Sequence, residues 1–117
     1  MLAPVFAVLT HLDYPKRYWL PGAVPYREQD YEEELRTILR AAARGGRVLE
    51  VNTTRGNVMC PDLLVVRWWR DLGGQAVSFG SDAHDPDKVA AGFEQARQLV
   101  EAAGFKPAKD PTAFWRR

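Results

Sequence analysis

The chain has 117 residues, of which 46% are hydrophobic, and its formal net charge at pH 7 is +1. This length suits one domain with a modest core, and the even balance of acids and bases argues against a nucleic-acid-binding or membrane-binding face. The single cysteine, Cys60, excludes a disulfide framework and indicates a buried thiol. We therefore expect residues 1–117 to be a single domain of a cytoplasmic protein, without nucleic-acid or membrane partners.

The first predicted elements are a strand, a loop and a helix. Residues 5–10 (VFAVLT) form an apolar run typical of a strand covered on both faces, and it ends at His11. The apolar start of the chain is too short to span a membrane and lacks the features of a secretion signal. After a loop rich in proline and aromatic residues, helical spacing and a terminal glycine pair predict an amphipathic helix over 27–46. Its apolar face would consist of Tyr31, Leu35, Ile38, Leu39 and Ala42.

Residues 47–52 (RVLEVN) predict a second strand, on which Glu50 and Asn52 share one face. Glu50 either pairs with a neighbouring arginine or belongs to a site. The segment 61–74 is ambiguous because its valines favour a strand, whereas its apolar spacing and glycine pair favour a helix. We predict a helix, with Trp68 and Trp69 in its packing face.

Residues 75–84 (QAVSFGSDAH) predict a third strand, and 85–104 predict a third helix with Val89 and Phe93 on its apolar face. We expect the terminal stretch 114–117 to be a docked or frayed tail. Strands that alternate with helices of this length form parallel sheets, so the fold class is α/β with three consecutive βα units. Functional groups in such sheets collect at the carboxyl ends of the strands.

Three of the residues at these predicted strand ends are suited to metal binding. Asp82 and His84 are two positions apart in GSDAH (80–84), and small neighbours leave room for an ion. An imidazole and a carboxylate suit zinc, manganese or iron, and His11 could be a third ligand if its strand lies close. The alternative is an aspartate that caps a helix and a histidine in an ordinary loop.

Two arginines follow strand ends by a few residues. Arg17 in DYPKRY and Arg55 in NTTRGN could both reach the same opening at the carboxyl ends of the strands. There they could bind a phosphate group through paired hydrogen bonds. Otherwise they are solvated loop arginines.

Three segments together resemble a known family. HLDYPKRY, LEVNTTRG and GSDAHDPDKVAAGFEQARQLVEAAGF, in this order and spacing, are similar to the C-terminal part of the polymerase and histidinol phosphatase (PHP) family, in its histidinol-phosphatase branch. The resemblance implies a distorted (β/α)7 barrel with a cluster of divalent metal ions, zinc, manganese or iron. It also implies His11, Asp82 and His84 as catalytic metal ligands and Arg17 and Arg55 as phosphate-binding residues.

The same resemblance implies a metal-dependent hydrolase that converts L-histidinol phosphate to L-histidinol in histidine biosynthesis. The His-x-His motif that opens the family's site is absent, and a barrel of this kind runs to about 250 residues. We therefore expect an incomplete or inactive portion of the enzyme. One alternative is a PHP-family phosphoesterase or nuclease with another substrate. Another is a non-catalytic piece that completes its barrel with a partner chain, or self-associates, through an open sheet edge.

Overall fold

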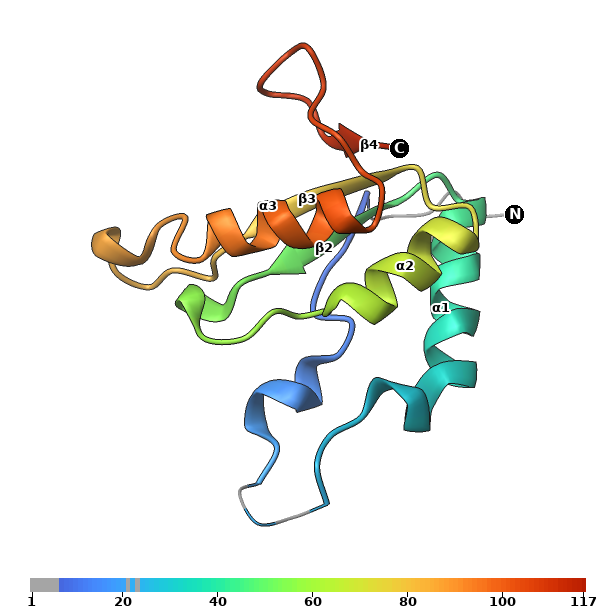
Figure 1. The fold of residues 1–117 in the computed structure, drawn as a ribbon, viewed down its shortest axis with the longest axis vertical. Coiled ribbons are helices and arrows are strands. Elements are labelled where there is room, and N and C mark those ends of the chain that lie inside the picture. Colours follow the sequence, from blue (N-terminus) through green and yellow to red (C-terminus); the bar gives the residue numbers. More distant parts are fainter. Residues whose placement is uncertain (1–6, 21, 23) are drawn as a thin grey trace.

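The computed structural model describes residues 7–20, 22 and 24–117, and within them the fold is a small sheet with helices packed beside it (Figure 1). The sheet has the order β1-β2-β3-β4, formed by β1 (Val8–Leu9), β2 (Val48–Asn52), β3 (Ala76–Gly80) and β4 (Trp115–Arg116). The first three strands are parallel, as predicted, and β4 runs antiparallel to β3. The helices α1 (Glu32–Arg44), α2 (Leu63–Asp71) and α3 (Phe93–Ala102) follow β1, β2 and β3 in turn.

The core lies between the sheet and the helices. Leu49 and Val51 of β2 pair with Val77 and Phe79 of β3, and the first three of these side chains are fully buried in the central apolar cluster. Alternation along a strand sends Glu50 and Asn52 to the opposite face. Figure 1 shows α3 lying across β2 and β3, and α3 contacts both β3 and α2. Burial of the helix-facing side chains therefore sets the register of the sheet.

The ambiguous segment 61–74 is a helix, α2, as predicted. The Asp62 carboxylate caps its start by accepting a hydrogen bond from the Leu63 amide at 2.7 Å. Val65, Trp68 and Trp69 are buried, and the Trp69 indole donates to the Ala76 carbonyl at 3.0 Å. Trp69 thus holds the start of β3, and Arg36 of α1 lies over the Trp68 ring at 5.0 Å.

Two helix predictions are corrected in their details. In the predicted helix 27–46, residues Glu28–Tyr31 form a 3-10 turn before α1, and Tyr31 and Ile38 are 40% and 45% exposed rather than buried in the core. In the predicted helix 85–104, the α-helix begins only at Phe93, and Val89 is 68% exposed. The α-helix begins late because Ala90 (φ 62°) and Gly92 (φ 81°) adopt left-handed backbone, which an α-helix cannot include.

The first and last strands also differ from expectation. The prediction that residues 5–10 are a strand covered on both faces is wrong for Val8 and Leu9, which are only half-buried because β1 lies at the end of the described sheet; residues 5 and 6 lie outside the described residues. The tail 114–117 is docked, and its Trp115 packs edge-on against Phe79 with ring centroids 5.5 Å apart. In the described part of the chain, no helix is long and apolar enough to cross a membrane.

Candidate functional site

Each parallel strand is followed by a residue with left-handed backbone. These residues are His11 (φ 53°) after β1, Thr54 (φ 47°) and Arg55 (φ 55°) after β2, and Asp82 (φ 55°) after β3. Residues other than glycine rarely adopt positive φ, and such conformations gather at functional sites, where the surrounding structure must hold them. The carboxyl edge of the sheet is therefore the candidate functional edge.

The loops after β2 and β3 are tied to each other by backbone hydrogen bonds. The Thr53 amide donates to the Gly80 carbonyl, and the Arg55 amide donates to the Ser81 carbonyl, both at 2.8 Å. The fully buried Thr53 also donates from its hydroxyl to the Ala91 carbonyl at 2.5 Å. These bonds fix Arg55 and Asp82 relative to one another before any ligand arrives.

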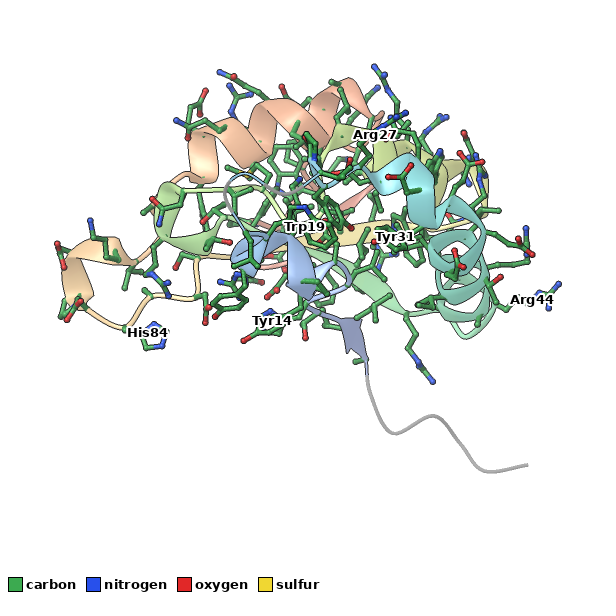
Figure 2. All side chains as sticks on the ribbon, turned by 90° about the horizontal axis from the view of Figure 1, so that it is seen from below. Tyr14, Trp19, Arg27, Tyr31, Arg44 and His84 are labelled. Carbon is green, nitrogen blue, oxygen red and sulfur yellow. The ribbon has the colours of Figure 1, made fainter. Side chains whose placement is uncertain are left out.

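An open hollow of about 500 Å³ lies over these loops, and all five residues singled out in the sequence border it. Figure 2 shows Tyr14 and His84 along the same edge of the molecule. The complete lining consists of His11, Tyr14, Arg17, Tyr18, Arg55, Asp82, His84 and Asp85. We call this the strand-end hollow. The prediction that these polar residues meet at a common mouth therefore agrees with their placement.

Asp82 is the centre of charge in the strand-end hollow. Its carboxylate accepts a hydrogen bond from Arg17 Nη2 at 2.6 Å and lies 3.7 Å from Arg55 Nη1. The hydrogen bond from Arg17 lowers the pKa of Asp82 below its ordinary value. The Arg17 side chain is only 5% exposed, so it is not a solvated loop arginine.

The two histidines each contact one of these arginines. Arg17 Nη1 lies 3.4 Å from His11 Nδ1, and Arg55 Nη1 lies 3.1 Å from His84 Nδ1. The Asp82 carbonyl oxygen is 2.9 Å from His84 Nδ1 and accepts a hydrogen bond from Arg55 at 3.2 Å. Cations and potential metal ligands therefore alternate around the hollow.

Sequence reasoning missed three residues that line the hollow: Tyr14, Tyr18 and Asp85. The Tyr14 ring stands edge-on to His11 with centroids 5.5 Å apart, and Arg17 Cζ lies 5.6 Å from its centroid. The Tyr14 hydroxyl donates to that of Tyr18 at 3.3 Å. The sequence signal for the two tyrosines was their spacing around Arg17 in YPKRY. A 3-10 turn over Tyr14–Tyr18 brings both rings to the same side as the arginine.

Glu50 and Asn52 share a strand face, as predicted, but neither lines the hollow. The Asn52 side chain donates to Glu50 Oε1 at 3.1 Å and accepts from the Thr54 amide at 2.9 Å. The Asn52 side chain therefore organises the turn that contains Arg55. Glu50 accepts a hydrogen bond from the same side chain.

The side chains of the strand-end hollow include the ligand types that divalent metals prefer, but too few of them converge to hold an ion. Imidazole and carboxylate groups are ordinary ligands of zinc, manganese and iron. Among the residues that the structure describes, however, no three His, Cys, Asp or Glu side chains are placed to hold an ion together. Both guanidinium groups contact Oδ2 of Asp82, so a metal at this hollow needs further ligands beyond this carboxylate and the two histidines.

The fold and the hollow define an α/β protein whose candidate site lies at the carboxyl ends of parallel strands. No protein-family model matches the chain. The chain is similar to histidinol-phosphatases over most of its length. It is 32% identical over 104 residues to a probable histidinol-phosphatase of Clostridium acetobutylicum, which covers 85% of this chain and 40% of that protein. A probable histidinol-phosphatase of Thermotoga maritima is 31% identical over 104 residues, or 86% of this chain and 42% of that protein.

A solved structure shows the same relationship. The crystal structure of histidinol phosphate phosphatase from Lactococcus lactis, complexed with zinc, L-histidinol and phosphate, matches with a TM-score of 0.69 and 26% identity. The match covers 87% of this chain and 40% of that one. The chain therefore spans about two fifths of the length of its relatives, and the predicted α/β class with consecutive βα units is confirmed.

Proposed function

We propose that the chain is the C-terminal part of a PHP-family histidinol-phosphatase and supplies part of its site for L-histidinol phosphate. The observation that carries this proposal is the strand-end hollow, where two arginines, two histidines and an aspartate from three separate loops meet. Similarity to histidinol-phosphatases along most of the chain supports the same substrate class.

Arg17 and Arg55 are the residues proposed to bind the phosphate group. Guanidinium groups present paired donors that match phosphate oxygens, and two of them neutralise much of a phosphate monoester's charge. Arg17 is held by Asp82 and packs beside the Tyr14 ring, so its orientation is already set. Pre-set cations stabilise the charge that builds up in phosphoryl transfer without reorganising during the reaction.

His11, Asp82 and His84 are proposed to contribute to a divalent metal site, for which zinc in the Lactococcus lactis relative is the precedent. A bound divalent metal would activate water and neutralise phosphate charge. Since three such ligands do not converge in the described residues, the remaining ligands must come from residues outside this set. We therefore expect the chain alone to bind phosphate but not to turn over substrate.

Calorimetric titration with inorganic phosphate, followed by a phosphatase assay with zinc or manganese, tests both parts. Arg55→Gln should weaken phosphate binding by about tenfold or more, because a charge-assisted hydrogen bond is lost. Arg44→Gln, at an exposed position of α1 that Figure 2 shows at the far side of the molecule from His84, is the matched control and should bind like the parent. Equal affinity in Arg55→Gln would contradict the phosphate site. Turnover above about 1 s⁻¹ that disappears in Asp82→Ala would contradict the incomplete site.

A second candidate is a chain that completes its barrel with another polypeptide. Within the described residues, β1 pairs with β2 alone, and a groove of about 460 Å³ runs beside it along α1. The groove is mostly apolar, with Leu9, Ile38, Ala41 and Ala42 among its lining residues. An open strand edge beside an apolar groove is suited to another strand and helix.

A further inference from the structure

A second hollow lies between the 3-10 turn Tyr14–Tyr18 and the start of α1. Its volume is about 260 Å³, and it shares no lining residue with the strand-end hollow. Three aromatic rings form one continuous wall: Trp19 meets Tyr26 edge-on at 5.2 Å between centroids, and Tyr26 stacks on Tyr31 at 5.8 Å. Figure 2 shows Trp19 and Tyr31 close together and well away from His84. We call this hollow the aromatic pocket.

Asp13 lines the aromatic pocket, and its carboxylate lacks a hydrogen-bond partner. The residue is 2% exposed. The Lys16 ammonium group attracts this carboxylate through space, but it donates hydrogen bonds to Glu28 at 3.0 Å and to the Met59 carbonyl at 3.2 Å. A buried carboxyl without a partner either stays neutral or pairs with a cation that enters from outside.

The surroundings favour the cation. A second acid, Glu34, also lines the pocket, and among the described residues its lining includes no lysine, arginine or histidine. Electron-rich faces of tryptophan and tyrosine attract ammonium groups, and this attraction grows where water is excluded. The remaining lining, which includes Leu12, Pro15 and Leu35, is apolar and suits a hydrocarbon body. An anion has no cationic side chain to pair with among the described residues of this lining.

We propose that the aromatic pocket binds a small organic cation whose ammonium group is attracted by the buried Asp13 carboxylate while its apolar body packs against Trp19, Tyr26 and Tyr31. The volume of about 260 Å³ limits the ligand to a small molecule. This site is separate from the strand-end hollow and does not depend on the proposed function. Among the described residues, Asp13 is the buried acid whose side-chain oxygens lack a hydrogen-bond partner, and it lines this pocket.

The test compares two probes of the same shape, tert-butylammonium and tert-butanol, by calorimetry and by the NMR shift of the Trp19 indole at constant ionic strength. We expect the ammonium to bind at least about tenfold more tightly than the alcohol. Asp13→Asn should remove that preference, and Asp71→Asn, which changes an exposed acid on α2, should keep it. Should Asp13→Asn fail to fold, Tyr31→Ala, which removes a 40% exposed ring from the wall, should weaken ammonium binding.

Equal binding of the two probes, or an unchanged preference in Asp13→Asn, would overturn the proposal and leave Asp13 as a neutral buried carboxyl. Arg55→Gln should not alter ammonium binding. Phosphate binding by Arg55→Gln therefore tests the strand-end hollow, and ammonium binding by Asp13→Asn tests the aromatic pocket. The failure of one proposal can be told apart from the failure of the other.

Discussion

At the scale of single residues, the ion pair between Asp82 and Arg17 governs the strand-end hollow. It holds the arginine in place with a contact of 2.6 Å, but it also occupies the donors that a phosphate would use. Arg55, 3.7 Å from the same carboxylate, faces the same competition. In the metal-free chain, Asp82 is thus both the organiser of the two cations and a competitor for them.

Replacing Asp82 by asparagine should therefore strengthen phosphate binding in the metal-free chain. A partly exposed ion pair contributes up to about 1 kcal/mol, which corresponds to an increase in affinity of roughly two- to fivefold. Titration calorimetry with inorganic phosphate and a chelator measures it. Asp85→Asn removes the same charge from the same hollow without an ion pair to either arginine and should give a smaller gain. Weaker phosphate binding in Asp82→Asn would contradict this prediction. It would show that the Asp82 carboxylate helps phosphate by positioning the arginines more than it hinders phosphate by competing for them.

Cys60 allows a prediction about pH. Burial raises the pKa of the Cys60 thiol from 9.0 to about 11. Between these values the folded chain holds its proton more tightly than the unfolded chain, so this contribution to stability is complete below pH 9 and is lost as the pH rises towards 11. The free energy of unfolding, from urea titrations at pH 8 and pH 10.5, should fall more in the parent chain than in Cys60→Ala. Equal slopes would mean that the thiol titrates alike in both states.

At the scale of elements, the turn between α2 and β3 decides how the helix meets the sheet. Trp69 at the end of α2 is fully buried, and its ring lies against the backbone of Gly74. A Cβ at Gly74 would lie only 2.2 Å from the ring. The second glycine of the Gly73-Gly74 pair is therefore required for close packing, in addition to ending the helix.

Gly74→Ala should accordingly lower the free energy of unfolding by about 1–3 kcal/mol, the usual cost of overpacking a core. Urea denaturation followed by tryptophan fluorescence measures the change. Gly45→Ala is the matched control, because the nearest atoms to an added Cβ there are 3.5 Å away or more. Two variants of equal stability would mean that the Trp69 ring moves aside without cost.

At the scale of the whole molecule, the two edges of the described sheet differ in what lies beside them. On one side β3 is flanked by β4, whereas on the other β1 lies at the end of the sheet beside an apolar groove on α1. The chain also spans about two fifths of the length of its relatives. The uncovered β1 edge and groove form the surface on which another strand and helix would continue the sheet.

We expect this surface to make the isolated chain self-associate. Ile38, 45% exposed in the groove, is the residue to test. Ile38→Glu should shift the molar mass measured by light scattering towards the monomer, since a charge in an apolar contact is costly. Val89→Glu, at an exposed position far along the chain, is the control and should behave like the parent. A monomer at every concentration for the parent chain would contradict self-association.

The elements could be predicted from sequence because their causes are local. Apolar spacing and glycine stops identified α2, and alternation placed Glu50 and Asn52 opposite Leu49 and Val51. The break at Ala90 and Gly92 and the pairing of β4 with β3 could not be predicted. Left-handed backbone at an alanine is set by surrounding loops, and a strand of two residues has too little pattern to detect.

For the strand-end hollow, the candidate residues could be chosen from the sequence, because parallel strands bring their carboxyl ends to one edge wherever the strands lie in the chain. How these residues pair follows from the three-dimensional packing of the loops. This packing placed Arg17 on Asp82, set Tyr14 against His11, and left the Asp13 carboxylate buried without a hydrogen-bond partner in a separate aromatic pocket. Such pairings depend on distances between loops far apart in the chain, and no local pattern encodes those distances.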